Sequence, residues 1–474
     1  MGTKNSKLKP MYYTCHEIAH TWHPSCTWVA LEIAESCFWE ALKIYGAVYG
    51  VSTMLKGKIP SREQMRTLIW NTIQSSIFLS VNTGAYISVV CLLRRIIGSF
   101  NYYTLGWLGA VISSFLAILV ERPSRRSLLA VYVSNVATES LLHSYVQDGT
   151  LPSIPHGEVL TFAGISAICM YLFKSKLKRN EIDPSKEKDK TNSNDHEDIL
   201  LKLIRLLVGK SEQTYSRDER EPLMKYIGKI VLGFWSKREP RRGQSVCGHT
   251  EESCVVYGLK GSIVPFAIGQ ALQAGLFALP MIQGRSRNGL STILSHISRP
   301  DVLLWSCFLG SFPAVYKLAS CFLRNALGVD HRWNAIPAGF LAGLTMAFSP
   351  SRSMCLYSVW KTLEIVCTKG VQNGTLPRIP LGVEILYASS TSVLLHLGVV
   401  SPQSLKPSYW KFVSRITGDR FLEVNRPLLD HTYNVSASAL LPNFEPRFPR
   451  PDLISAECQA IGQEFKGKYN TFSL

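Results

Sequence analysis

Apolar residues gather in ten runs, most of them close to the length of a membrane-spanning helix. The runs cover about 38–56, 67–90, 102–120, 128–146 and 158–173 in the first half, and about 255–282, 302–323, 333–349, 353–370 and 382–400 in the second. A helix that crosses a bilayer needs roughly 20 mostly apolar residues. The pattern therefore predicts an all-α fold, a polytopic helical membrane protein with about 8–10 membrane-associated helices.

Polar side chains interrupt the first two runs, among them Glu40, Lys43 and Asn82. Such residues are tolerated where a helix faces other helices rather than lipid, so the runs indicate a bundle and not single anchors. The alternative is a soluble protein with several core helices, because runs such as 105–120 and 336–348 are short for a span. So many apolar runs in one chain are hard to bury without lipid, which favours the membrane protein.

Short sequence blocks recur in the same order in the two halves of the chain. The matched blocks are Glu35-Ser36-Cys37 with Glu252-Ser253-Cys254, Cys91-Leu92-Leu93-Arg94 with Cys321-Phe322-Leu323-Arg324, and Gly149-Thr150-Leu151-Pro152 with Gly374-Thr375-Leu376-Pro377. Tyr86 matches Tyr316 at the same offset as the second block. The pattern predicts two homologous repeat halves, a common plan of transporters; five spans in each would invert the second half. The alternative is duplication of a packing unit without transport.

The chain divides into five predicted parts. They are a Cys/His-rich N-terminal segment (1–27), a first membrane repeat (28–175), a charged linker with basic amphipathic helices (176–246), a second membrane repeat (247–400) and a polar C-terminal tail (401–474). Residues 174–198 mix acidic and basic side chains without apolar periodicity, as a solvated linker does. Basic segments within 202–242 suit a membrane surface, and we expect them to recruit partners or anionic lipid.

Composition agrees with a membrane protein. Hydrophobic residues make up 46% of the chain and charged residues 18%, against about 25% in soluble domains. This composition excludes a disordered chain and disfavours an ordinary soluble enzyme. The net charge of +17 suits either nucleic acid or an anionic membrane surface, and the apolar runs favour the membrane.

Cysteine and histidine are dense near the start, in the pattern Cys15-His16-x3-His20-x2-His23-x2-Cys26. A second group, Cys247-x-His249-x4-Cys254, opens the second half. These residues indicate either a structural metal or redox pair, or interfacial histidines with free thiols. The intervals fit no strong zinc signature, so the sequence assigns no metal and no cofactor. With only 12 cysteines in 474 residues, we expect most of them to be reduced.

Four charged residues, Glu139, Glu364, Lys43 and Lys260, occupy matched places in or beside apolar helices. An intramembrane carboxylate can relay a proton or bind a cation, and it can equally form a buried ion pair. Lys361 lies one turn before Glu364 and is a candidate partner. Arg94 and Arg324, with Tyr86 and Tyr316, are further repeat-matched candidates.

Small-residue and lipidation motifs add two expectations. The spacings Gly46-x3-Gly50 and Gly339-x3-Gly343 predict close helix packing. Met1-Gly2-Thr3-Lys4-Asn5-Ser6 fits the pattern for myristoylation of Gly2, although a short motif also matches by chance and a protein with its own spans gains little from one acyl chain. Phosphate-binding, dinucleotide-binding, zinc-protease and nucleophile-elbow motifs are missing from the sequence, so no catalytic residues are assigned and we expect no enzyme.

The sequence resembles the transmembrane protein 135 family, also called peroxisomal membrane protein 52, over nearly its whole length. The motifs that carry the resemblance are His20-Thr21-Trp22-His23-Pro24-Ser25-Cys26, Leu119-Val120-Glu121-Arg122, Ser124-Arg125-Arg126, Ala338-Gly339-Phe340-Leu341-Ala342-Gly343 and Leu405-Lys406-Pro407-Ser408-Tyr409-Trp410-Lys411-Phe412. The charged linker, the C-terminal tail and the Gly2 motif depart from the family pattern. The repeats are distantly similar to channel subunits of mitochondrial protein import.

The resemblance implies a multi-pass protein of mitochondrial and peroxisomal membranes. It implies that the protein promotes mitochondrial fission, with the dynamin-related fission GTPase as a partner, and that it supports peroxisome organisation and lipid metabolism. Membrane lipid is the other expected partner, and nucleic acid is not expected. The alternative function is a lipid or small-solute transporter or channel with a pathway between the two repeats.

Overall fold

The computed structural model describes residues 7, 9–54, 60–181, 199–209, 247, 253–282, 290–328, 330–441 and 448–470. Gly2, His249 and most of the basic segment 202–242 lie outside the described residues. The regular secondary structure of the described residues is helical, apart from an isolated bridge between Met11 and Phe100. It forms two compact units, Met1–Ser153 with Pro377–Leu474 (unit 1) and Ile154–Leu376 (unit 2). The all-α prediction is confirmed.

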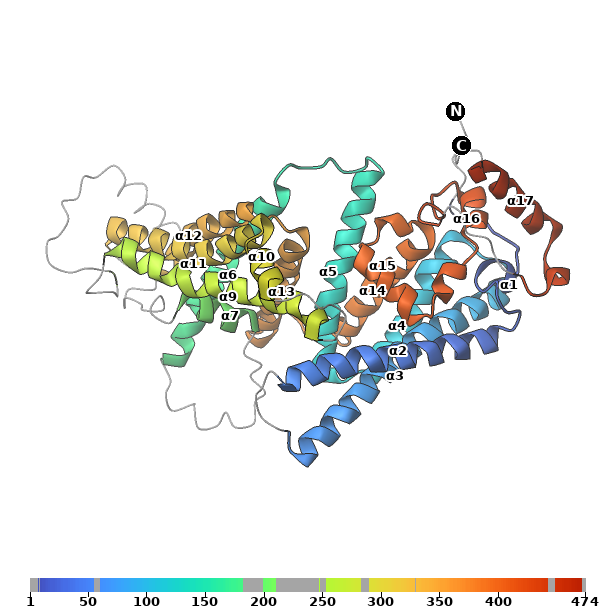
Figure 1. The fold of residues 1–474 in the computed structure, drawn as a ribbon, viewed down its shortest axis with the longest axis horizontal. Helices are drawn as coiled ribbons and strands as arrows, with labels where there is room; N and C mark the ends of the chain where they lie inside the picture. The colour runs from blue at the N-terminus through green and yellow to red at the C-terminus, as the bar shows by residue number, and fades with distance from the viewer. Residues whose placement is uncertain are drawn as a thin grey trace. The chain divides into compact units, whose positions relative to one another are not determined.

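Unit 1 is built around two long helices that pack side by side, α2 (Cys26–Met54) and α3 (Arg62–Ile97), drawn in blue in Figure 1. A short π-helix (Thr104–Leu108) leads into α4 (Gly109–Val120), and Pro123 then begins α5 (Pro123–Gln147). Helix α14 (Gly382–Val400) packs against both α4 and α5. The described part of the unit also contains the α-helices α1 (Cys15–Ile18), α15 (Pro407–Ile416), α16 (Arg426–Tyr433) and α17 (Ala456–Asn470) and three 3-10 helices, Pro402–Ser404, Arg420–Glu423 and Pro451–Leu453.

Unit 2 repeats this plan with different helices. The long pair is α9 (Cys254–Ile282) and α11 (Pro300–Leu327), which lie side by side in Figure 1. Helices α12 (Ala335–Gly343) and α13 (Arg352–Gln372) both pack against α6 (Gly157–Glu181). The described part of the unit also contains the shorter helices α7 (Ile199–Val208) and α10 (Leu290–Ile297) and two 3-10 helices, Arg332–Asn334 and Leu344–Phe348.

The turns that end matched helices have the same geometry, which supports the predicted repeat. Helices α3 and α11 end at Gly98 (φ 79°) and Gly328 (φ 67°), whose N–H groups donate to the carbonyls of Arg94 and Arg324. Glycine alone adopts this left-handed conformation without strain. Gly149 (φ 69°) and Gly374 (φ 74°) play the same part after α5 and α13.

The last helix of each sequence half belongs to the compact unit of the other half. Helix α6 precedes the linker in sequence but packs in unit 2, and α14 packs in unit 1. The compact units therefore cross the predicted domain ranges 28–175 and 247–400. Pattern matching finds repeated segments, whereas long-range packing decides which segments share a core.

Five described helices are long and apolar enough to cross a membrane. They are Arg62–Ile97, Gly157–Lys174, Cys254–Ala278, Pro300–Leu327 and Gly382–Val400. The apolar segment Thr104–Val120 is shorter than a full span. These helices, together with the fold class, confirm the prediction of a polytopic helical membrane protein.

The C-terminal region is more ordered than the predicted polar tail. Residues 401–441 pack into unit 1, where Leu428, Leu429 and Tyr433 are buried in its core. Arg426 is buried as well, and its guanidinium donates to the carbonyls of Gly398, Phe421 and Leu422. The prediction of a polar tail was wrong here because it was based on composition. A buried arginine whose hydrogen bonds are accepted by carbonyls is part of a core, although its residue type is typical of an exposed surface.

The two glycine pairs differ in their surroundings. A Cβ added at Gly343 would lie 2.5 Å from the Cα of Ala163, and one at Gly339 would lie 2.9 Å from the carbonyl oxygen of Ser166. Both contacts are with α6, so this pair allows α12 to approach that helix closely. A Cβ at Gly46 or Gly50 would meet no described atom within 4 Å, so the described residues do not support a packing role for that pair.

We expect Gly343→Ala to destabilise the protein, because backbone atoms of α6 cannot move aside for the new methyl group. Overpacking of this kind costs about 1–3 kcal/mol. The matched control is Gly46→Ala, where the methyl group has open space and alanine favours the helix. Thermal unfolding of both variants in detergent checks the expectation, and equal melting temperatures would contradict it.

Candidate functional site

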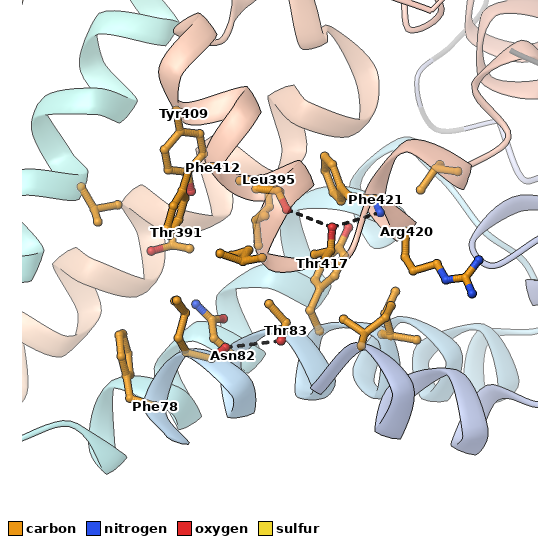
Figure 2. A pocket seen from close by; sticks show the side chains of 18 of the residues that line it. Phe78, Asn82, Thr83, Thr391, Leu395, Tyr409, Phe412, Thr417, Arg420 and Phe421 are labelled. Carbon is orange, nitrogen blue, oxygen red and sulfur yellow. Dashed lines mark hydrogen bonds between the residues drawn. The ribbon is translucent and has the colours of Figure 1, made fainter. Parts of the chain in front are cut away.

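An apolar cavity of about 160 Å³ lies within unit 1. Its walls come from both sequence halves, since α3 contributes Phe78, Leu79 and Tyr86 while α14 contributes Tyr387, Thr391 and Leu395. Figure 2 shows Phe78, Asn82 and Thr83 on one wall, with Tyr409 and Phe412 of α15 across the cavity from them.

Polar side chains in the cavity lining are mostly bonded to the protein itself. The hydroxyls of Thr83, Thr391 and Thr417 donate to carbonyls of their own helices. The Asn82 side chain donates to the hydroxyl of Tyr387 at 3.3 Å and accepts from Ser114 at 3.1 Å. With these groups satisfied, the cavity offers a ligand chiefly aromatic and aliphatic surface.

Arg420 is the charged residue of the cavity lining. Its guanidinium binds the carboxylate of Glu32 at 2.6 Å and lies 5.1 Å from the ring centre of Trp22. Figure 2 shows this side chain pointing away from the aromatic part of the cavity. The arrangement places a polar group at one side of an otherwise apolar chamber, as a site for an amphipathic molecule requires.

The wall beside Arg420 depends on the buried Arg426. Its guanidinium lies 5.4 Å from the ring centre of Trp410 and 5.5 Å from that of Phe421, in addition to its three carbonyl acceptors. These contacts join the end of α14 to α15 and to the turn that follows α15. Arg426 therefore fixes the position of the C-terminal residues that line the cavity.

Of the repeat-matched candidates, Tyr86 lies in the cavity lining. The Tyr86 hydroxyl donates to the carbonyl of Leu105 at 2.8 Å, and Tyr316 is fully buried in unit 2. The matched arginines at the ends of α3 and α11 hold neighbouring segments in different ways. Arg94 donates to the carbonyls of Tyr12 and Tyr13, while Arg324 lies 3.2 Å from the carboxylate of Asp330.

The predicted intramembrane charges lie away from the cavity lining. Glu139 pairs with Lys406 at 3.5 Å, and Glu364 pairs with Lys361 at 2.5 Å, which is the partner suggested by sequence. Both carboxylates are half-buried, and both belong to helices outside the five candidate spans. Lys43 pairs with Glu40 at 2.5 Å, and Lys260 is exposed. The pairs favour a structural role for the acids, and a role in transport stays a prediction.

The N-terminal cysteines and histidines separate into two groups. Cys15, His20 and Cys26 come together with Cys91 of α3, while His16 and His23 lie outside this group. Sequence spacing missed Cys91 because it reaches the site through the fold of the α2–α3 pair.

We expect Arg426→Met to destabilise unit 1 by at least about 2 kcal/mol, because the change leaves three carbonyls without their donor. The matched control is Arg415→Met, since Arg415 is exposed and its pair with Glu40 is worth about 1 kcal/mol or less. Thermal unfolding in detergent is the measurement. Equal losses of stability in the two variants would refute the assignment.

Comparison with known proteins bears on the N-terminal part of unit 1. No solved structure matches the chain. Residues 12–146 match the family model described as the N-terminal cysteine-rich region of Transmembrane protein 135. The match covers α1 to α4, nearly all of α5, and all four of the clustered residues Cys15, His20, Cys26 and Cys91. With its apolar helices the chain is a multi-pass helical membrane protein, and its residues 12–146 are similar to the N-terminal cysteine-rich region of Transmembrane protein 135.

Proposed function

We propose that this chain is a non-enzymatic protein of mitochondrial and peroxisomal membranes that binds lipid in the cavity of unit 1. On this proposal it promotes mitochondrial fission, together with the dynamin-related fission GTPase, and supports peroxisome organisation and lipid metabolism. The organelles, the partner and the cellular role rest on the family resemblance. Lipid binding rests on the structure, and the apolar cavity is the observation that carries it.

The surroundings of the cavity support a lipid ligand. Two candidate spans, α3 and α14, line it, so an acyl chain or sterol in the bilayer lies next to its walls. Apolar cavities of protein interiors stay dry and take up apolar molecules. The polar side of the lining at Arg420 suits the head of an amphipathic lipid, whose apolar part then contacts Phe78, Leu79 and Phe412.

One observation favours a second candidate function, a lipid or small-solute transporter. The cavity is lined by α3 from one sequence half and α14 from the other, as a pathway between repeats requires. Binding is common to both functions, and movement across the membrane is specific to transport. The two are therefore separated by a flux measurement.

Lipid binding is tested by filling the cavity. We expect Leu79→Trp, which replaces a buried lining residue, to reduce crosslinking of a photoreactive fatty acid or sterol at least about tenfold, because the indole occupies the space of the ligand. The matched control is Leu92→Trp on the same helix, where the side chain is 54% exposed. Both variants must elute as single species with similar melting temperatures.

Equal crosslinking of the two variants, or none in the unaltered protein, would overturn the binding proposal. A flux measurement on the protein reconstituted in vesicles then distinguishes binding from transport. Flux of a labelled lipid that Leu79→Trp abolishes supports the transporter, whereas binding without flux supports the first function. Live imaging of mitochondrial length and peroxisome number in cells that carry either variant tests the cellular role, and we expect Leu79→Trp alone to change them.

A further inference from the structure

Four soft donor atoms converge at the N-terminal end of unit 1. The Sγ atoms of Cys15, Cys26 and Cys91 and a ring nitrogen of His20 all lie within 4.8 Å of one another. A tetrahedral zinc ion with Zn–S distances of about 2.3 Å holds its ligands about 3.8 Å apart, so small side-chain adjustments bring these donors to coordination distance. Three thiolates and one imidazole form a common structural zinc site.

The orientation of His20 matches that of a metal ligand. Its Nδ1 lies 2.8 Å from the carbonyl oxygen of His23. A carbonyl only accepts hydrogen bonds, so Nδ1 carries the hydrogen and Nε2 keeps its lone pair in the neutral ring. Nε2 faces the Sγ of Cys91 at 3.6 Å, and His20 is fully buried. Metal-ligating histidines are oriented in this way by a partner on the other ring nitrogen.

The local chain is built to hold these donors. Thr14 caps α1, and the carboxylate of Glu17 receives hydrogen bonds from the backbone and side chain of Ser455. The Thr21 hydroxyl donates to the carbonyl of Glu423 at 2.9 Å. The segment 14–25 is thus fastened to the C-terminal region on both sides of His20.

A related cluster in unit 2 argues against a chance encounter of thiols. Cys247, Cys254 and Cys321 also lie within 4.8 Å of one another. Cys321 follows Cys91 at the repeat offset, and Cys254 begins α9 as Cys26 begins α2. The structure thereby relates Cys254 to Cys26, where the sequence blocks had matched it with Cys37. Thiols therefore recur at the same two places of the long helix pair in both units.

We propose that Cys15, His20, Cys26 and Cys91 bind one zinc ion, which fastens the segment before α2 to the end of α3. The ion joins donors from α1, from the loop after it, and from both long helices of unit 1. Its role is structural, because four protein ligands complete the tetrahedron and leave no open position for a substrate.

Metal analysis of the full chain, purified in detergent without chelator, tests the proposal. We expect Cys91→Ser to contain one zinc ion per chain fewer than the unaltered protein. The matched control is Cys37→Ser on α2, because Cys37 is buried like Cys91 but lies outside the cluster. We expect the zinc content of this variant to equal that of the unaltered protein. Equal zinc contents in Cys91→Ser and the unaltered protein would overturn the proposal.

Two further measurements test the zinc site even if Cys91→Ser fails to fold. His20→Cys keeps four donors, so we expect it to retain the ion and, with cobalt in place of zinc, to show stronger thiolate-to-metal absorption than the unaltered protein. In the unaltered protein, we expect a chelator to increase the labelling rate of Cys15 and Cys26 at least tenfold. Unchanged labelling, absence of tetrahedral cobalt absorption, or a disulfide between cluster residues in the intact mass would each reject the zinc site.

Discussion

Helices α6 and α14 each pack in the compact unit of the other sequence half, and we call this arrangement the helix exchange. Ion pairs with little access to water hold these two helices in place. Helix α6 enters unit 2 with Lys174, whose ammonium is buried and lies 2.8 Å from the carboxylate of Asp330. Helix α14 enters unit 1 with Glu384, which binds Arg126 at 2.9 Å. A buried charge that loses its partner is costly, by about 3–5 kcal/mol. Each pair therefore ties a helix of one sequence half to the core of the other.

The cavity is a consequence of this exchange. Without α14, the surfaces of α3 and α5 that line it would lack their facing wall. Hydrogen bonds from Asn82 to Tyr387 and between Ser134 and Ser390 set the position of α14 along that wall. Because these polar groups bond to one another, the helices can meet through them and still leave apolar surface for the chamber.

Sequence periodicity predicts helices well here because apolar runs of this length have few other stable forms. The matched blocks also indicate the repeat, since Gly98 and Gly328 end their helices by the same left-handed turn. The exchange of α6 and α14 lies beyond such reasoning, because it depends on contacts between distant segments. The cavity was missed for the same reason, because its walls come from five separate stretches of the chain, within 19–45, 78–87, 129–133, 387–395 and 409–424.

The cysteines show most clearly where spacing stops being informative. Metal signatures in sequence rely on donors close together along the chain, and Cys15, His20 and Cys26 satisfy that only in part. The fourth donor, Cys91, stands near the end of the helix that returns beside α2. When two consecutive helices pack side by side, the beginning of the first lies near the end of the second, whatever the length of chain between them. The donor set therefore follows from the pairing of α2 with α3. The same pairing of α9 with α11 brings Cys254 to Cys321, and the duplicated hairpin thus carries its thiols with it.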